Sequence, residues 1–248
     1  MTRLSGQHAV VTGGGTGIGA AIARALGAEG ARLTLIGRRR EPIEQVAHEC
    51  GGLAVRADVT QRNEVVAAFA KARATNGPIA ILVNNAGAAE SASFAKVGEE
   101  AWRAAMAVNL DAVFHCCQAA LADLLAAEAA RIVTIASTAG LRGYSYTSAY
   151  CAAKHGAVGL TRALAEEFAG TGLTANAICP GFTDTAIVAD AAERLAAKTG
   201  RSLDQSRAAL AELNPSGRLI GPDEVAAEVV RMCLPEAAGI TGQAIEIS

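Results

Sequence analysis

The sequence predicts an α/β fold, in which one doubly wound parallel sheet of about seven strands carries helices on both faces. Short apolar runs alternate with longer helical stretches along the whole chain, and such runs are typical of strands buried on both faces. No linker, internal repeat or low-complexity tract interrupts this alternation. Of the 248 residues, 51% are hydrophobic but only 4% are aromatic, which favours a core of small side chains. We therefore expect residues 1–248 to form a single domain.

The expected elements follow one another in strict order. The strands are His8–Thr12, Arg32–Ile36, Leu53–Ala57, Ile79–Val83, Arg131–Ala136, Leu173–Cys179 and Gln243–Ile247. The helices are Gly17–Glu29, Arg40–Glu49, Arg62–Ala74, Glu99–Ala126, Ser148–Ala169 and Pro222–Met232. Proline and two acidic residues open the last helix, as the first turn of a helix prefers.

One segment departs from this rhythm. Residues 182–216 contain no expected strand and predict two amphipathic helical pieces, Ala186–Lys198 and Ser202–Glu212, around Thr199-Gly200. Long excursions inside compact domains are usually lids or binding loops. This one follows the sixth strand at its carboxyl end, where ligands bind in open α/β sheets. We expect a substrate lid here, with Gly200 as a hinge.

Composition excludes several classes of protein. A formal net charge of −2 argues against nucleic acid or an anionic membrane as the main partner. No apolar run reaches transmembrane length, and the first residues lack a secretory apolar core. Six scattered cysteines without a Cys-x-x-Cys pair, and only four histidines, favour neither a metal site nor a disulfide framework. A reducing, cytoplasmic location is the expectation.

Glycines gather where the first strand meets the first helix. Residues 12–19 fit two spacings, Gly13-x-x-x-Gly17-x-Gly19 and Gly15-x-Gly17-x-x-Ala20, and the second is a form of the dinucleotide fingerprint. Backbone N–H groups and the helix dipole would hold a pyrophosphate there. A glycine-rich turn without a ligand is the alternative, but the preceding strand and following helix favour nucleotide binding and a Rossmann-type sheet.

The end of the second strand bears on the choice of cofactor. A carboxylate at this point binds the ribose hydroxyls of NAD, whereas arginine accommodates the 2′-phosphate of NADP. The sequence reads Ile36-Gly37-Arg38-Arg39-Arg40, without an acid at the strand tip. NADP(H) is therefore favoured over NAD(H), although at least one of the arginines is expected to be a solvated start of the next helix.

Tyr150 and Lys154 stand at i and i+4, and Ser137 lies thirteen residues before the tyrosine. On a helix the pair shares one face. A phenol ionises near ~10, and a neighbouring ammonium favours the phenolate. A tyrosine tuned in this way can exchange a proton with a carbonyl or alcohol oxygen while hydride moves. A lone Tyr-x-x-x-Lys has little value, but these three residues follow a nucleotide loop.

Taken together and in order, the motifs resemble the short-chain dehydrogenase/reductase family over essentially the whole chain. They are Thr-Gly-x-x-x-Gly-x-Gly at 12–19, Asp58-Val59, Asn84-Asn85-Ala86-Gly87, Asn109, Ser137, Tyr150, Lys154 and Pro180-Gly181. The resemblance implies Tyr150 as the proton donor or acceptor and Ser137 as the residue that orients the substrate oxygen. It also implies that Lys154 lowers the pKa of Tyr150 and binds the nicotinamide ribose, and that Asn109 anchors a water relay.

The same resemblance implies a cofactor site and a substrate pocket. The cofactor residues would be Gly13, Thr16, Gly17, Ile18, Gly19, Arg38, Arg39, Asp58, Val59, Asn85, Ala86, Gly87, Tyr150, Lys154, Pro180, Gly181, Thr183 and Thr185. Arg142 and Tyr144 are expected in the substrate pocket. For Tyr144 and Tyr146, covering the surface is an equal alternative, because aromatic rings with polar tips suit both places.

The implied function is an NAD(P)(H)-dependent interconversion of a secondary alcohol and a ketone. The lid segment and the stretch Asn214-Pro-Ser-Gly-Arg218 look similar to those of acyl-thioester and polyketide ketoreductases and of 3-hydroxybutyrate dehydrogenases. A 3-oxoacyl or 3-hydroxyacyl compound is therefore the favoured substrate class. The alternatives are an NAD-linked dehydrogenase of a hydroxy acid, cyclic alcohol or steroid, and a catalytically silent nucleotide-binding regulatory protein. The apolar helices Glu99–Ala126 and Ser148–Ala169 predict a homotetramer or dimer.

Overall fold

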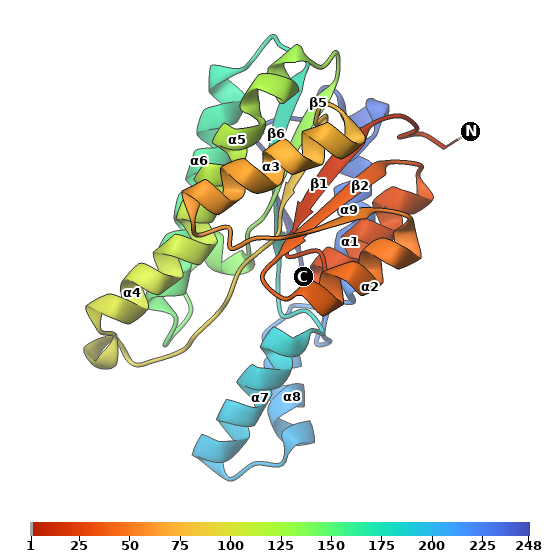
Figure 1. Ribbon diagram of the computed structural model, residues 1–248. Helices are drawn as coiled ribbons and strands as arrows, with labels where there is room; N and C mark the ends of the chain where they lie inside the picture. The colour runs from red at the N-terminus through yellow and green to blue at the C-terminus, as the bar shows by residue number, and fades with distance from the viewer. Residues whose placement is uncertain (1) are drawn as a thin grey trace.

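The computed structural model describes residues 2–248, and within them seven strands form one parallel sheet (Figure 1). The strand order is β3-β2-β1-β4-β5-β6-β7. All strands are parallel, and the chain builds the sheet outward in one direction from β1 to β3 and in the other direction from β4 to β7. The strands are β1 His8–Thr12, β2 Arg32–Gly37, β3 Leu53–Arg56, β4 Ile81–Asn84, β5 Ala130–Ile135, β6 Leu173–Pro180 and β7 Ala244–Ile247. The doubly wound α/β prediction is confirmed, and strand ends differ from the expected ones by one or two residues.

Helices cover both faces of the sheet (Figure 1). They are α1 Gly17–Ala28, α2 Arg40–Cys50, α3 Arg62–Asn76, α4 Glu99–Met106, α5 Ala112–Ala126, α6 Ser148–Glu167, α7 Ala186–Thr199, α8 Leu203–Ala211 and α9 Pro222–Cys233. The helices α1, α2 and α9 pack on one face, and α3, α5 and α6 pack on the other.

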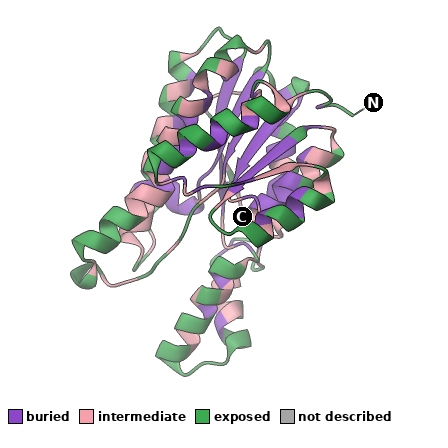
Figure 2. Ribbon diagram, in the orientation of Figure 1, coloured by how far each residue is buried: buried purple, intermediate pink, exposed green. Residues whose placement is uncertain are grey.

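The core consists of two large apolar clusters, one on each face of the sheet, and a small third cluster of Ala136, Val158, Ala177 and Cys179. Figure 2 shows the central strands of the sheet buried, while the helices are buried on their inward side. Ile22, Leu26 and Leu35 belong to the first cluster, and Phe69 and Leu124 belong to the second. Many of the helical members are alanines, which allow helices to lie close to the sheet, as the composition predicts.

The expected helix Glu99–Ala126 is interrupted by a π-helical turn at Ala107–Asp111. Inside this turn the Nδ2 of Asn109 donates to the carbonyl oxygen of Ala105, four residues earlier, at 3.0 Å. A side chain that bonds the helix backbone competes with the regular ladder, and π turns occur frequently at functional sites. The turn divides the helix into α4 and α5.

The same helical run also differs from the expectation that no apolar stretch reaches transmembrane length. One 18-residue window within Glu99–Ala126 has a mean hydropathy of 1.3, so the run is long and apolar enough to cross a membrane by length and composition. However, Cys116, Ala120 and Leu124 of α5 are buried in the second apolar cluster. Core helices of α/β sheets pass the same test, and we identify this run as a core helix.

The segment after β6 forms two helices, as predicted. Figure 1 shows α7 and α8 side by side, projecting beyond the carboxyl ends of the strands. Gly200 ends α7 in the left-handed conformation, with φ +73°, and Ser202 opens α8 through a capping box with Gln205. Gly200 therefore lies at the tip of this helical hairpin, between the two helices.

Candidate active site

Two adjoining cavities lie at the carboxyl ends of the strands, where the strand order reverses. Their volumes are about 250 and about 410 Å³, and Gly13, Thr16, Ala86 and Gly87 line both. In open α/β sheets this reversal leaves a crevice in which ligands bind. The strands β1, β4, β5 and β6 all deliver residues to the first cavity.

The glycine loop forms a cradle that side chains would fill. Gly13 and Gly17 have positive φ angles of +65° and +52°. A Cβ at Gly13 would lie 2.9 Å from Nδ2 of Asn85, and one at Gly19 would collide with the carbonyl oxygen of Gly13. Among the described residues, α1 receives no side-chain cap from Thr16 and has no acid in its first turn. Its N–H groups are therefore free for an anion, and the loop fits the pyrophosphate of a dinucleotide.

Thr12 and Asn85 tie this loop to the end of β4. The Oγ1 of Thr12 accepts the N–H groups of Asn85 and Ala86 at 3.0 and 3.1 Å. The Nδ2 of Asn85 donates back to the carbonyl oxygens of Thr12 and Gly13 at 2.9 and 3.2 Å. These bonds fix both sides of the crevice before a ligand arrives. Sequence reasoning gave Thr12 no such role, although it begins the glycine motif.

Arg38, Arg39, Asp58 and Val59 line the second cavity. Among the described residues, neither arginine forms an ion pair, and both are exposed. The Oδ1 of Asp58 accepts the N–H and the hydroxyl of Thr60, at 3.0 and 2.8 Å. The carboxylate is thus partly engaged within its own turn, while the two guanidinium groups remain available for an anionic ligand.

Ser137, Tyr150 and Lys154 meet at the other end of the first cavity. The serine precedes the 3₁₀ turn Thr138–Gly140, and its Oγ accepts the N–H of Ala139 at 3.1 Å. Tyr150 and Lys154 come from the first two turns of α6. The Nζ of Lys154 donates to the carbonyl oxygen of Ile135 at 2.8 Å. The lysine side chain is fixed beside the tyrosine.

Asn109 lies beside these residues through its π turn. It is fully buried, and its Nδ2 donates to the carbonyl oxygen of Ala88 at 2.9 Å. Its Oδ1 accepts the N–H of Ala88 at 3.3 Å. A Cβ at Gly87 would lie 2.9 Å from this Oδ1 and 3.5 Å from the Nζ of Lys154. Glycine at 87 therefore lets the β4 loop approach the site closely.

Burial determines the direction of the two main pKa shifts. Desolvation raises the pKa of Tyr150 to about 12, although the Ser137 hydroxyl opposes the shift. Desolvation also lowers the pKa of Lys154 to about 8. The expected lowering of the Tyr150 pKa by the ammonium is therefore not what this structure shows, because loss of water around the phenol dominates.

A third cavity of about 160 Å³ opens beside Ser137 and Tyr150. It is lined by Tyr144, as expected, and by residues that sequence reasoning did not single out, namely Thr138, Phe182, Ile187, Val188 and Arg194. Arg142 is not part of this lining, contrary to expectation. Its guanidinium group instead donates to the Oη of Tyr144 at 3.0 Å and pairs with Glu246 at 3.2 Å.

The structure thus distributes the expected residues over three neighbouring cavities. The first takes those of the glycine loop, the β4 loop, the Ser137–Tyr150–Lys154 group and the segment after β6, namely Gly13, Thr16, Gly17, Ile18, Gly19, Asn85, Ala86, Gly87, Asn109, Ser137, Tyr150, Lys154, Pro180, Gly181, Thr183 and Thr185. Tyr146 is 67% exposed and lies apart from all three. Within residues 2–248, no cluster of three or more His, Cys, Asp or Glu side chains could hold a metal ion.

Comparisons with known proteins agree with this geometry. A family model described as short chain dehydrogenase matches residues 7–196. The chain is 36% identical over 254 residues to a putative ketoacyl reductase of Streptomyces coelicolor, covering 100% of this chain and 97% of the relative. It is 38% identical over 245 residues to a D-beta-hydroxybutyrate dehydrogenase of Cupriavidus necator, covering 96% and 95% of the two chains.

A solved structure is similar along nearly its whole length. It is a variant of actinorhodin polyketide ketoreductase, crystallised with NADPH, and is 35% identical to this chain. The two superpose with a TM-score of 0.93, covering 97% of this chain and 95% of the other. The sheet described above is therefore shared with that protein.

Proposed function

The chain belongs to the short-chain dehydrogenase family, and from this premise we propose that it reduces 3-oxoacyl compounds with NADPH or oxidises the corresponding 3-hydroxyacyl compounds. As a member of this family it is an NAD(P)-dependent oxidoreductase that interconverts secondary alcohols and ketones. The observation that carries the proposal is the convergence of Ser137, Tyr150 and Lys154 at the junction of the nucleotide crevice and the third cavity. Residues 1–248 act as one catalytic domain, with 182–216 as its lid.

In this proposal each polar group of the site has one task. A bound nicotinamide dinucleotide supplies or accepts the hydride. The Oη of Tyr150 gives a proton to the carbonyl oxygen, or takes one from the alcohol. Because the Oγ of Ser137 already accepts the Ala139 N–H, its own O–H is left to donate to the substrate oxygen. Ser137 therefore orients the reacting group toward Tyr150.

Lys154 and Asn109 support this proton transfer. One of the three N–H groups of Lys154 is held by the Ile135 carbonyl oxygen, which leaves two for the ribose hydroxyls of the cofactor. Its positive charge also favours the phenolate form of Tyr150 when a proton leaves. Asn109 keeps the π turn and the β4 loop in register, and anchors a water relay that resupplies the proton.

We assign the preference for NADP(H) over NAD(H) to Arg38 and Arg39. Arg38 and Arg39 line the cavity that receives the adenosine end, and a 2′-phosphate there would form charge-assisted bonds with them. The presence of NADPH in the similar ketoreductase structure supports this preference. NAD(H) remains the alternative, and in either case Asp58 and Val59 would lie at the adenine.

Substrate class rests on the third cavity and on the relatives. That cavity is mostly apolar and lies directly beside the reacting residues, which suits an acyl chain. One relative is named a putative ketoacyl reductase, another a D-beta-hydroxybutyrate dehydrogenase and a third a 3-oxoacyl-[acyl-carrier-protein] reductase, and the last two names describe 3-hydroxy and 3-oxo compounds. The proposed enzyme is a cytoplasmic homotetramer or dimer built on α4, α5 and α6.

A single assay tests the proposal. The purified protein is incubated with NADPH or NADH and with 3-oxoacyl thioesters, cyclic ketones, steroid ketones and the matching alcohols. We expect NADPH-dependent reduction of the 3-oxoacyl thioesters to have the highest kcat/KM. Faster turnover of a hydroxy acid or steroid with NAD would favour the alternative dehydrogenase. No turnover of any compound would favour a nucleotide-binding regulatory protein.

A further inference from the structure

Phe182, at the base of the lid, forms part of the wall of the third cavity, which is the proposed substrate cavity. It lies two residues after the end of β6 and lines the third cavity together with Tyr144. The two rings meet edge to face, with their centres 6.0 Å apart and an angle of 81° between the planes. This is a favourable geometry for an aromatic pair. Ile187 and Val188 of the lid helix α7 line the same cavity.

Tyr144 is fixed on its side of the pair by polar contacts. Its hydroxyl donates to the Oγ1 of Thr138 at 2.9 Å and accepts a bond from Arg142 at 3.0 Å. Arg142 in turn pairs with Glu246 of β7 at 3.2 Å. The ring is therefore connected to the sheet through a chain of contacts and has little freedom to rotate away from the cavity.

Phe182 is fixed through its backbone by Asn214. The Oδ1 of Asn214 accepts the N–H of Phe182 at 2.9 Å, and its Nδ2 donates to the carbonyl oxygen of the same residue at 2.9 Å. One side-chain amide thus pairs with both backbone groups of one residue. Asn214 is only 3% exposed, so water does not compete with these bonds.

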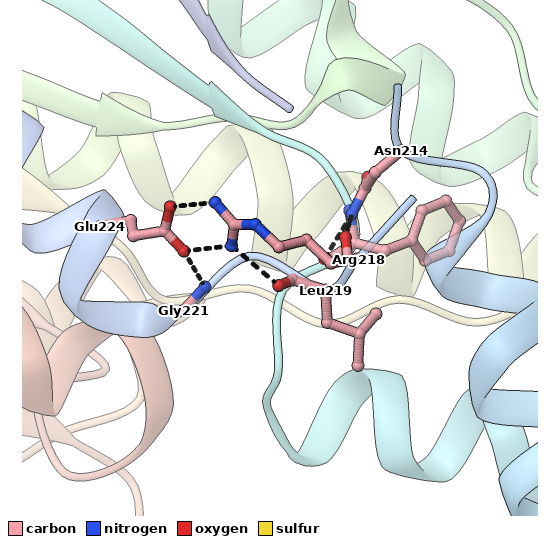
Figure 3. A network of polar contacts seen from close by, with 6 residues as sticks. Asn214, Arg218, Leu219, Gly221 and Glu224 are labelled. Carbon is pink, nitrogen blue, oxygen red and sulfur yellow. Dashed lines mark hydrogen bonds and ion pairs between the residues drawn. The ribbon is translucent and has the colours of Figure 1, made fainter. Parts of the chain in front are cut away.

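The loop that carries Asn214 is itself held in place. The Nδ2 of Asn214 also donates to the carbonyl oxygen of Arg218 at 2.7 Å. The Arg218 guanidinium forms two 2.6 Å bonds to Glu224, which also accepts the N–H of Gly221 at 2.7 Å (Figure 3). A Cβ at Gly181 would collide with the Oδ1 of Asn214. The amide therefore sits against the backbone with no spare space.

The small size of the third cavity means that the fixed positions of Phe182 and Tyr144 limit what it can hold. Its volume is about 160 Å³. An apolar protein cavity of about 150 Å³ holds a benzene molecule, which corresponds to about six non-hydrogen atoms. Because both rings of the wall are fixed, the cavity cannot lengthen toward them. Among its lining residues Glu90, Ser91 and Arg194 are exposed, so we take their side as the mouth of the cavity.

We infer that Asn214 is a positioning residue that sets the chain length of the substrate. By holding Phe182 against Tyr144, it limits the acyl group beyond the reacting carbonyl to a short one, of the size of a 3-oxobutanoyl group. The thioester tail leaves through the mouth of the cavity. This inference rests on the proposed 3-oxoacyl function for its choice of substrate, but not for the position of the wall.

The test compares 3-oxobutanoyl, 3-oxohexanoyl and 3-oxooctanoyl thioesters of N-acetylcysteamine. For the wild type, we expect kcat/KM to fall by about tenfold or more between the shortest and longest chains, because a pocket discriminates strongly at each methylene that it cannot hold. Asn214→Ala releases Phe182 and should reduce this ratio several-fold, mainly by lowering the KM for the longest chain. Phe182→Val should do the same while leaving the Asn214 amide paired.

Two further variants separate positioning from general stability. Arg207→Gln removes the lid ion pair with Asp184 at 2.7 Å but leaves the bonds of Asn214 in place, so the chain-length ratio should stay as in the wild type. The double variant Asn214→Ala with Phe182→Val should show no more relaxation than Phe182→Val alone, because both changes act through one ring. If Asn214→Ala does not fold, Asn214→Asp, which keeps the acceptor for the Phe182 N–H, replaces it.

Several outcomes would overturn the inference. Equal kcat/KM for the three wild-type substrates would do so, and so would a folded Asn214→Ala variant with an unchanged ratio. If no thioester is reduced but simple ketones are, the proposed substrate class fails, and the ratio is then read from 2-butanone and 2-octanone. A crystal structure of the Asn214→Ala variant gives an answer without turnover, since an unmoved Phe182 ring contradicts the inference and a displaced ring supports it.

Discussion

The Nζ of Lys154 lies 5.7 Å from the centre of the Tyr150 ring, one helical turn along α6. This distance places a buried positive charge beside a phenol whose own burial raises its pKa. Burial disfavours the charged form of both residues, the ammonium and the phenolate, and so moves their pKa values in opposite directions. A change to either side chain should therefore alter proton transfer.

Tyr150→Phe tests the proton donor. We expect the variant to keep its fold and its affinity for the cofactor but to lose about 10²- to 10⁴-fold in kcat, because only the acid–base group is removed. Steady-state kinetics and a cofactor fluorescence titration measure the two quantities. Tyr146→Phe, at an exposed tyrosine just before α6, is the matched control and should be fully active. Near wild-type activity of Tyr150→Phe would refute the mechanism.

Lys154→Met should weaken both catalysis and cofactor binding, and it should also change how stability depends on pH. Burial lowers the pKa of Lys154 to about 8 from 10.5, so between these values the unfolded chain binds more protons than the folded one. The free energy of unfolding of the wild type should therefore rise with pH in this window, relative to Lys154→Met. Urea unfolding at pH 7 and pH 9.5 measures it, with Lys198→Met as the exposed control. Parallel curves for wild type and Lys154→Met would contradict the assigned burial effect.

Arg38→Asp should shift cofactor preference toward NADH. The substitution removes a charge-assisted contact to the 2′-phosphate and adds an acceptor for the ribose hydroxyls. We expect the ratio of kcat/KM for NADPH to that for NADH to fall by about 10- to 100-fold. Arg40→Gln, at an arginine that pairs with Glu44 outside the cavity, should leave the ratio unchanged. If the wild type already prefers NADH, Arg38 does not contact a phosphate.

The exposed apolar residues of α4 and α5 predict assembly. Trp102, Phe114 and Leu125 are 39%, 41% and 43% exposed. Burial of such side chains against another copy of the chain would remove apolar surface from water. Multi-angle light scattering at micromolar concentration should give a dimer or tetramer, and Phe114→Glu should reduce the mass. Leu203→Glu on α8 is the control, and a wild-type monomer would refute this prediction.

3-Oxoacyl thioesters should have a higher kcat/KM than small ketones, because the open mouth of the cavity accommodates the thioester tail. Binding of that remote part can be used to orient the reacting carbonyl, which raises kcat/KM. We also expect the lid, residues 182–216, to be the most mobile ordered region and to close over the bound cofactor and substrate, excluding water. Hydrogen exchange with and without ligand measures the closure. Equal kcat/KM for acetone and 3-oxobutanoyl thioester would indicate a general carbonyl reductase instead.

The sequence predicts most of this fold because apolar runs and glycines act locally. His8–Thr12 and the loop that follows need only their own residues to indicate a strand, a tight turn and a helix. The order of the motifs along the chain then predicts the groups that meet at the crevice. Tyr150 and Lys154 share a helix, so their proximity follows from spacing alone.

The remaining features depend on contacts between segments that are distant in sequence. In the π turn the amide of Asn109 bonds with Ala88, twenty-one residues earlier, and the periodicity of the sequence does not predict such a bond. Arg142 pairs with Glu246 on the last strand, and this contact directs it away from the cavity. The pKa of Tyr150 likewise depends on how much protein surrounds the phenol, which spacing does not reveal.

The pairing of Asn214 with Phe182 makes the intervening 31 residues a closed loop on the sheet. Once the two ends of a loop are joined, the entropy of closure changes only slowly with the length between them. The helical hairpin can therefore vary in length and sequence while the strands keep their register. Insertions, deletions and substitutions in the lid can therefore change which substrate is bound, through selection or design, while the sheet that carries the catalytic residues stays the same.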